Sequence, residues 1–281
     1  VPPPEPRPPD DEPAAAGGAE ADGGKGGDAL PTLEDQLNSV GIGRFQFSVA
    51  LTAGLFVFGD GMEMAAVTML AKMLRLEWDV GWRELALLGS VIFAGYIIGN
   101  VWGGWCSDRF GRKWALFAFG MVFMFGGVCS VVSYSFVVFA LSRFVTGIGI
   151  GAAAGSASSL MAEVSPTVHR GKLTMIVTGL GTAGGMAAVA GAGILCHNDA
   201  PTWLPDWWRL MLLLCVLPTA VGLACLTQVL ESPHWCLVNG RQEEAEALLR
   251  QLARENGRED RLLCGGKLYF RPPDEGVGAG R

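Results

Sequence analysis

Long apolar runs alternate with short clusters of charged residues between Arg44 and Glu231, and this alternation constrains the fold more than any other feature. A hydrocarbon core about 30 Å thick is crossed by about 20 helical residues, which is the length of these runs. Charged residues make up 17% of the 281 residues, against about 25% in a typical soluble protein. The pattern predicts an all-α membrane protein with six transmembrane helices. We expect the spans at residues 45–71, 85–107, 114–133, 136–162, 173–196 and 210–230.

The chain divides into this bundle and three further regions. Residues 1–29 form an acidic tail rich in Pro, Gly and Ala, which we expect to be disordered because it cannot bury enough apolar surface. Residues 30–44 begin with a capping-box pattern and continue with apolar residues at helical spacing, which predicts an amphipathic helix on the membrane surface. The six-helix bundle occupies residues 45–231. Residues 232–281 are expected to be a cytoplasmic linker with a short helix and a disordered end.

Lys and Arg in short loops indicate how such a bundle is oriented, because they favour the cytoplasmic side. The loops on the two sides carry nearly equal numbers of these residues, so the loops alone do not decide the orientation. Five further basic residues after the sixth span lie on the side of the loop between the second and third spans: Arg241, Arg250, Arg254, Arg258 and Arg261. We therefore expect both termini to be cytoplasmic.

The segment GGWCSDRFGRK, from Gly103 to Lys113, places charged residues between the second and third spans. Lipid does not accommodate such a cluster, so we expect a short aqueous loop. Opposite charges at the ends of several helices can join the helices in one conformation and separate in another. Alternatively, these charges only end the helices at the interface. The candidate residues for a cytoplasmic gating network are Gly104, Asp108, Arg109, Arg112, Lys113, Glu163, Arg170 and Glu231.

Three charged residues lie inside the expected spans: Asp60 and Glu63 in the first and Arg143 in the fourth. An acid at bilayer depth costs about 2.5–3.5 kcal/mol on insertion scales, so such residues are functional candidates. The spacing i, i+3 puts Asp60 and Glu63 on one helix face. Three interpretations remain open: a carboxyl that gains and loses a proton as the Arg moves, recognition of a cationic substrate, and a structural ion pair.

Four motifs, in this order, resemble the major facilitator superfamily in its sugar-porter-like branch. They are a G-x-x-x-D-R-x-G-R-K loop at 104–113, an R-x-x-x-G pattern at 143–147, an E-x-x-P-x-x-x-R-G loop at 163–171 and a segment similar to P-E-S-P-R-W at 230–235. The segments TLEDQLNSVGIGRFQ and GDGMEM are similar to the synaptic-vesicle-2-related transporters within that branch.

The resemblance implies that the chain is the N-terminal six-helix half of a transporter whose partner is a C-terminal six-helix half. It implies that Asp60 and Arg143 form a proton-coupling pair and that the charges at the span ends form the gating network. It also places Thr178 where sugar porters have a sugar-binding Gln in the fifth helix, which gives no support to hexose specificity. A polar stripe of Thr residues facing the central cavity is one interpretation of Thr178, and hydrogen bonding to its own helix is the other.

We therefore expect a membrane transporter that moves a small organic solute through the lipid bilayer by alternating access, coupled to protons. The alternatives are a facilitator of organic ions or sugars without proton coupling, and a non-transporting membrane scaffold or half-transporter. We expect no enzymatic activity, because no nucleophile and base are suitably placed. We also expect no cofactor, metal or nucleic-acid partner, because the His and Cys residues lack metal-ligand spacing.

Overall fold

The computed structural model describes residues 31–198 and 207–268. The acidic tail at 1–29 and the end of the chain, both expected to be disordered, lie outside these residues. The described residues form helices joined by short turns, without strands. Six of these helices are long and apolar enough to cross a membrane. The predicted all-α fold with six transmembrane helices is confirmed.

The spanning helices are α2 (Arg44–Trp78), α3 (Trp82–Phe110), α4 (Arg112–Val131), α5 (Phe136–Val164), α6 (Arg170–Asn198) and α7 (Trp207–Leu226). The shorter elements are α1 (Leu33–Val40), α8 (Pro233–Val238), α9 (Gln242–Glu255) and the 3-10 turns η1 (Glu259–Arg261) and η2 (Leu263–Gly266). The apolar part of α2 ends at Ala71. The sixth span is shorter than expected, because α7 ends at Leu226, so Glu231 lies in the turn that follows it.

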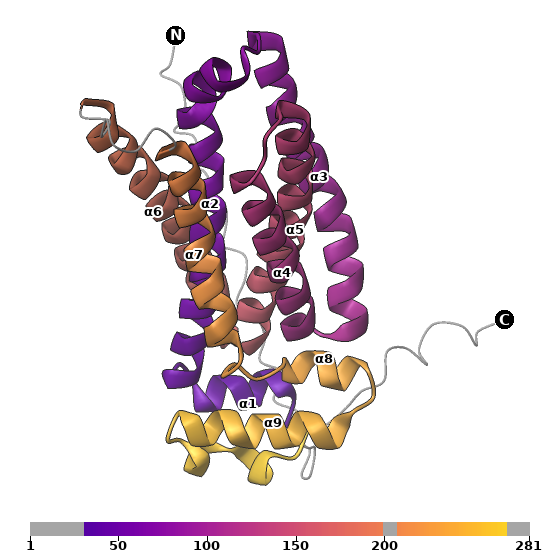
Figure 1. Ribbon diagram of the computed structural model, residues 1–281. Helices are drawn as coiled ribbons and strands as arrows, with labels where there is room; N and C mark the ends of the chain where they lie inside the picture. The colour runs from indigo at the N-terminus through magenta and orange to yellow at the C-terminus, as the bar shows by residue number, and fades with distance from the viewer. Residues whose placement is uncertain (1–30, 199–206, 269–281) are drawn as a thin grey trace, which may run out of the picture.

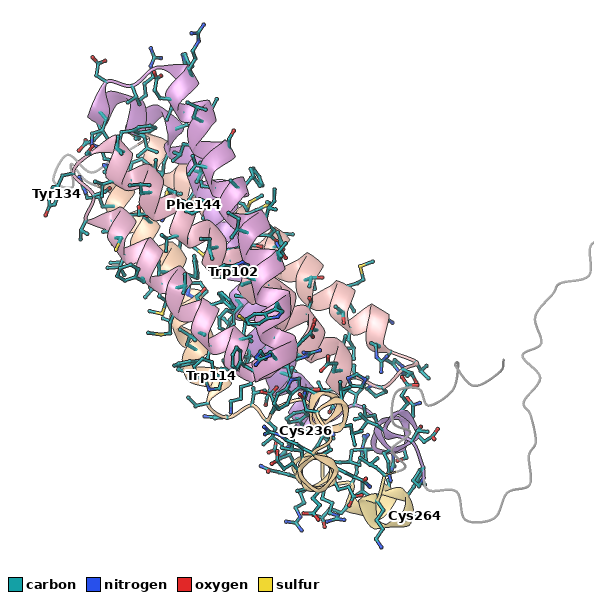
Figure 2. The ribbon with its side chains drawn as sticks, turned by 90° about the vertical axis from the view of Figure 1, so that its right-hand side faces the viewer. Trp102, Trp114, Tyr134, Phe144, Cys236 and Cys264 are labelled. Carbon is teal, nitrogen blue, oxygen red and sulfur yellow. The ribbon has the colours of Figure 1, made fainter. Side chains whose placement is uncertain are left out.

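The long helices stand side by side, and α1, α8 and α9 lie across one end of them (Figure 1). Helix α5 packs against both α3 and α4, while α6 and α7 pack against α2. We call the end with α1, α8 and α9 the basal end and the opposite end the far end. Cys236 and Cys264 lie at the basal end and Tyr134 at the far end (Figure 2). The turn between α3 and α4 also reaches the basal end, where the indole N–H of Trp235 donates to the backbone oxygen of Asp108 over 2.8 Å.

Glycines hold α3 and α5 close together. Apolar side chains gain little on leaving lipid for another helix, so close approach depends on small residues. A Cβ added at Gly99 would overlap the backbone oxygen of Ile148, and one at Gly103 would overlap Ala152. Gly147 of α5 meets the backbone of α3 in the same way. The two helix backbones are therefore in direct contact along this interface.

Replacing Gly99 by Ala is expected to lower the free energy of unfolding by about 1–3 kcal/mol, because the added methyl group overpacks a backbone contact. Gly104→Ala on the same helix is the matched control, since no atom lies within 4 Å of a Cβ added there. Thermal unfolding of the purified chain in detergent, followed by circular dichroism, measures both variants. Equal melting temperatures for the two variants would contradict the close contact of α3 and α5.

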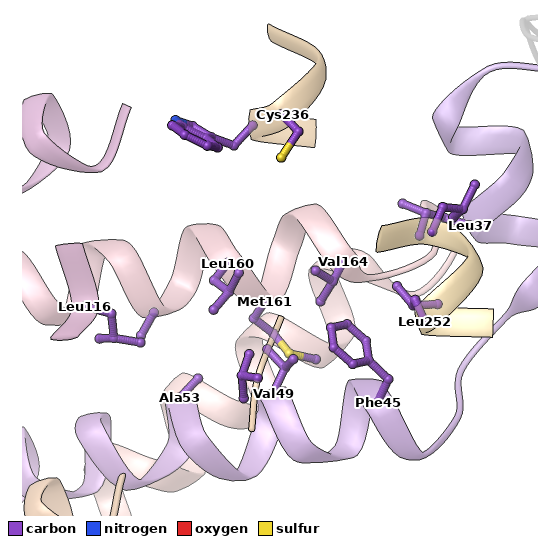
Figure 3. Close-up of a cluster of buried hydrophobic side chains, with 14 of the residues drawn as sticks. Leu37, Phe45, Val49, Ala53, Leu116, Leu160, Met161, Val164, Cys236 and Leu252 are labelled. Atoms are coloured by element: carbon purple, nitrogen blue, oxygen red, sulfur yellow. The ribbon is translucent and has the colours of Figure 1, made fainter. Parts of the chain in front are cut away.

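Helix α1 lies at the position of the expected amphipathic helix, but its apolar face is covered by protein. Leu33, Leu37 and Val40 are buried. They belong to a cluster that includes Phe45 of α2 and Leu252 of α9 (Figure 3). This corrects the expectation that the apolar face of residues 30–44 rests on the membrane surface. The Leu side chains of α9 provide an apolar surface within the same chain, so lipid is not needed to cover α1.

The segment after the bundle is docked and does not act as an extended linker. The Gln36 side chain donates to the backbone oxygen of Leu263 over 2.7 Å and accepts from the Leu263 backbone N–H over 3.0 Å. The Asn256 side chain accepts from the backbone N–H of Phe45 over 3.0 Å. These hydrogen bonds join polar groups of segments that are far apart in sequence. Gln36 and Leu263, for example, are separated by 227 positions. The first and the last segments of the described chain therefore contact each other at the basal end.

Alkylation of cysteines in the folded chain is expected to modify Cys264 well before Cys236. Cys264 is exposed, whereas burial, with Glu244 and Glu231 nearby, raises the pKa of the Cys236 thiol to about 11. Thiolate is the reactive form, so Cys236 reacts slowly at neutral or mildly alkaline pH. Brief exposure to N-ethylmaleimide followed by peptide mass spectrometry compares the two sites. Equal labelling without denaturant would contradict the docking of α8 and α9.

Candidate functional site

The segment GDGMEM, residues 59–64, positions two acids on α2. A Cβ added at Gly59 would lie 2.6 Å from the Thr219 hydroxyl of α7, and one at Gly61 would overlap the backbone of α6. The glycines therefore let α2 pack closely on α6 and α7. Asp60 and Glu63 line a cavity on another side of α2, next to α3 and α5. In this segment, the glycines of α2 therefore face the neighbouring helices, and the two acids face the cavity.

Glu63 forms a buried ion pair with Arg143 of α5, in which the guanidinium Nη1 donates to the carboxylate Oε2. The two side chains are only 4% and 1% exposed. The Arg143 Nε donates to the hydroxyl of Ser130 on α4 over 2.9 Å, and Ser130 shares a hydrogen bond of 2.7 Å with Ser142. The guanidinium carbon lies 5.5 Å from the centre of the Phe139 ring. Contacts from α2, α4 and α5 therefore hold the Arg143 side chain in place.

Asp60 is not the partner of Arg143, contrary to the pair that the family resemblance implied. Glu63 lies eight positions before Ala71 and Arg143 seven positions after Phe136, so both are about 10–12 Å below the far ends of their spans at 1.5 Å per residue. Asp60 lies one helical turn deeper. Its Oδ1 atom is buried and accepts no hydrogen bond within the described residues. Because Arg143 is at the depth of Glu63, Glu63 takes the ion pair, and Asp60 has no basic partner within the described residues.

A cavity of about 200 Å³ lies beside these three residues, between α2, α3 and α5. It brings Asp60, Glu63 and Arg143 together, as the sequence suggested, and adds side chains that the sequence did not single out. The cavity is lined by Asp60, Glu63, Met64, Val67, Thr68, Gly89, Ile92, Phe93, Tyr96, Arg143, Thr146 and Ile150. Inside it, Glu63 Oε1 and Arg143 Nη2 are also buried without a hydrogen bond within the described residues. The site thus keeps unused hydrogen-bonding capacity on all three charged groups.

Thr178 does not lie with these residues. It is half-buried on α6, and its hydroxyl donates to the backbone oxygen of Thr174 over 2.8 Å. Thr178 does not line the cavity beside Asp60. The hydroxyl is thus bonded to its own helix, and the position of Thr178 at the central cavity of a complete transporter stays a prediction.

At the basal end, Arg112 joins three helices. Its Nη1 lies 2.7 Å from a carboxylate oxygen of Asp108 on α3, and its Nε lies 2.9 Å from a carboxylate oxygen of Glu163 on α5. Its Nη1 also donates to the backbone oxygen of Ser107 over 2.7 Å. Arg112 is mostly buried, at 13% exposed, whereas Asp108 is 75% exposed. Arg112, Asp108 and Glu163 therefore form a compact ionic cluster where α3, α4 and α5 meet.

Glu231, in the turn after α7, contacts the start of α4 in the same region. Its carboxylate accepts from the backbone N–H of Lys113, in the first turn of α4, over 3.0 Å. A negative charge at this position satisfies free N–H groups and complements the helix dipole. Gly111 precedes the turn with φ +107°, and a Cβ there would overlap the Glu231 carboxylate. Glycine is therefore required at this position on both counts.

The other candidates of the expected gating network have different contacts. Arg170 lies 3.4 Å from the Glu34 carboxylate of α1. The Arg109 guanidinium lies 5.7 Å from the centre of the Trp105 ring. Lys113 contributes mainly its backbone N–H, and Gly104 has open space around it. Only part of the expected set is thus joined in one ionic cluster.

Comparison with protein families decides the class of this protein. The model of the family described as "Sugar (and other) transporter" matches residues 46–263, which cover the six spans together with α8 and α9. The chain belongs to this transporter family. The family lies within the major facilitator superfamily, so the superfamily predicted from the four sequence motifs is confirmed.

Several relatives of the sugar (and other) transporter family illustrate its breadth. The chain is 31% identical to the synaptic vesicle 2-related protein of Rattus norvegicus over 227 residues. It is 32% identical over 211 residues to the 4-hydroxybenzoate transporter PcaK of Pseudomonas putida. Among solved structures, it is similar to the xylose transporter XylE from E. coli in a partially occluded inward-open conformation, with a TM-score of 0.68 and 26% sequence identity.

The chain spans about half the length of these transporters or less. The match covers 80% of this chain and 40% of the rat protein, and 74% of this chain and 45% of PcaK. The match to the XylE structure covers 76% of this chain and 55% of that chain. The similarity therefore establishes an integral membrane protein with several spans that corresponds to one part of a larger transporter.

Proposed function

We propose that this chain is the N-terminal half of a transporter that moves a small organic solute by alternating access, with Asp60 as the proton-carrying group. The observation that carries the proposal is the Asp60 carboxyl, which has no basic partner within the described residues and lines a cavity beside the buried Glu63–Arg143 ion pair. Ionisable residues at bilayer depth are costly, and they mark proton and substrate pathways in membrane proteins.

The arrangement gives a physical route for proton coupling. Burial favours the neutral form of a carboxyl, and an approaching guanidinium favours the charged form. Arg143 already has one carboxylate partner, and its Nη2 is not used within the described residues. A small movement of α5 relative to α2 would bring Nη2 toward Asp60 and release a proton, and the reverse movement would favour proton uptake. Similarity to a protein described as a proton:xylose symporter supports this part of the proposal.

The second half is proposed to dock on α6, which together with α3 is one of the two spans least buried within the described residues. In the most apolar part of α6, only 11% of the residues are buried within this chain, compared with 56% in α5. Gly171, Gly179 and Gly191 have no neighbouring atom within 4 Å of an added Cβ. Small residues favour contact between helices over contact with lipid. The share of the relatives' length that this chain covers leaves enough sequence for a second unit of similar size.

The ionic cluster at the basal end is proposed to control the access of the solute from the cytoplasm, with both termini on that side. Arg112 holds α3, α4 and α5 together through Asp108 and Glu163. One exposed ion pair contributes about 0–1 kcal/mol, but several pairs together can bias two conformations that differ by a few kcal/mol. Glu231 adds a link from the turn after α7 to α4. The cluster would therefore favour the conformation in which the basal end is closed.

Uptake by the complete transporter, in which this chain is joined to a second six-helix unit, tests the proposal. The transporter is reconstituted in liposomes, and a pH gradient of either sign is imposed. Three radiolabelled solutes serve as probes: D-xylose, 4-hydroxybenzoate and 2-phenylethylamine. We expect gradient-dependent accumulation of at least one, abolished by a protonophore. Accumulation no higher than in protein-free liposomes for all three would contradict transport, and accumulation insensitive to the protonophore would contradict proton coupling.

A further inference from the structure

The cavity between α2, α3 and α5 contains more acidic than basic groups. Its lining includes two carboxylates, Asp60 and Glu63, and one guanidinium, Arg143. Glu63 already uses one oxygen for the ion pair with Arg143. The second oxygen, Oε1, and Asp60 Oδ1 accept no hydrogen bond within the described residues. With both acids ionised, the site carries one unbalanced negative charge and two free acceptor atoms.

The walls of the cavity are largely apolar. Met64 and Val67 of α2, Ile92 and Phe93 of α3 and Ile150 of α5 form most of them. One of the few hydroxyl groups in the lining, that of Thr146, already donates to the backbone oxygen of Ser142 over 2.9 Å. A sugar needs a polar partner for each of its many hydroxyl groups, because an unsatisfied buried hydroxyl costs free energy. These walls therefore suit an apolar body better than a sugar ring.

We infer that this cavity binds a small organic monocation, a protonated amine whose apolar body is about the size of one aromatic ring. The ammonium N–H groups donate to Asp60 Oδ1 and Glu63 Oε1, and the added charge balances the excess carboxylate. The apolar body lies against Ile92 and Phe93. A volume of about 200 Å³ is smaller than a pocket for a drug-sized ligand, which occupies about 300–1,000 Å³. An anion is disfavoured, because Arg143 is already paired with Glu63.

This inference rests on the proposed transport function and names the substrate class of the same site. Its test is equilibrium binding to the purified chain in lipid nanodiscs at neutral pH, without any gradient. The probes share a phenyl ring and a short chain: the cation 2-phenylethylamine, the neutral 2-phenylethanol and the anion 3-phenylpropanoate, with D-xylose as the sugar. Isothermal titration calorimetry gives the affinity of each. We expect the amine to bind at least tenfold more tightly than the alcohol, and the anion and D-xylose to bind more weakly still.

Variants then locate the charge that recognises the amine. Asp60→Asn is expected to weaken amine binding at least tenfold and to leave binding of the alcohol unchanged. Asp79→Asn removes the same charge from an exposed position at the far end of α2 and is expected to change neither affinity. Phe93→Ala is expected to weaken the amine and the alcohol to the same extent, because it removes part of the wall. If Asp60→Asn does not fold, the comparison of the four probes on the unmodified chain decides the matter.

Equal binding of amine and alcohol, tighter binding of the anion or of D-xylose, or no amine binding would overturn the inference. Unchanged amine affinity in a folded Asp60→Asn variant would do the same. Failure of this inference and failure of the proposed function can be told apart. Gradient-driven uptake of D-xylose or 4-hydroxybenzoate without amine binding would reject the substrate class alone. Amine binding without gradient-driven uptake of any probe would reject transport and leave the binding site standing.

Discussion

Replacing Asp60 by Asn is expected to abolish the pH-gradient-driven accumulation of solute by the complete transporter. Asn is close to Asp in size but cannot gain or lose a proton, so the proposed carrier group is lost while the shape of the cavity remains. Asp60 accepts no hydrogen bond at Oδ1 within the described residues, so little packing or hydrogen bonding is disturbed. Uptake of the radiolabelled solute that the unmodified transporter accumulates should fall to the level of protein-free liposomes.

Two companion variants make this result specific. Asp60→Glu keeps an ionisable carboxyl in the cavity and is expected to retain part of the accumulation. Asp79→Asn changes an exposed Asp that directly follows the same helix, outside the cavity, and is expected to transport normally. Unchanged uphill accumulation by Asp60→Asn would rule out Asp60 as the proton-carrying group.

Replacing Arg143 by Gln is expected to have the largest effect on stability. The change leaves Glu63, which is only 4% exposed, without its basic partner. Removing one partner of a buried ion pair costs about 3–5 kcal/mol, because an uncompensated charge stays in a medium of low polarity. The free energy of unfolding, measured by denaturant titration of the purified chain in detergent, should fall by that amount.

The double variant Glu63→Gln with Arg143→Gln should recover most of the lost stability, because neither side chain is then charged. Arg170→Gln serves as the control for an exposed pair. Arg170 and Glu34 are 36% and 59% exposed, and exposed pairs contribute about 0–1 kcal/mol. A double variant as unstable as Arg143→Gln alone would show that the cost arises from lost packing rather than from an unpaired charge.

The spans were predictable because their determinants are local in sequence. Each apolar run is long enough to cross a bilayer, and charged clusters such as that ending at Lys113 mark where the chain leaves it. Gly95, Gly99 and Gly103 recur at every fourth position of α3, and Gly99 meets the backbone of α5. A short helix was expected within residues 232–281, and α9 (Gln242–Glu255) lies there.

The partners of side chains were harder to predict, because they depend on relative depth and on distant segments. Glu63 rather than Asp60 pairs with Arg143, which depends on the exact register of α2 against α5. No pattern near Ser130 indicated that its hydroxyl would hold Arg143. The burial of α1 depends on α9, which lies about 200 residues later in the sequence. Amphipathicity predicts that one face is covered, but it does not say whether lipid or protein covers it.

Infrared difference spectroscopy of the purified chain in lipid nanodiscs, recorded between alkaline and acidic pH, tests most directly whether Asp60 is the group that exchanges a proton. The account predicts that one component of the protonated-carboxyl absorption at acidic pH persists in Glu63→Gln and is lost in Asp60→Asn. A band that disappears in Glu63→Gln and persists in Asp60→Asn would contradict it.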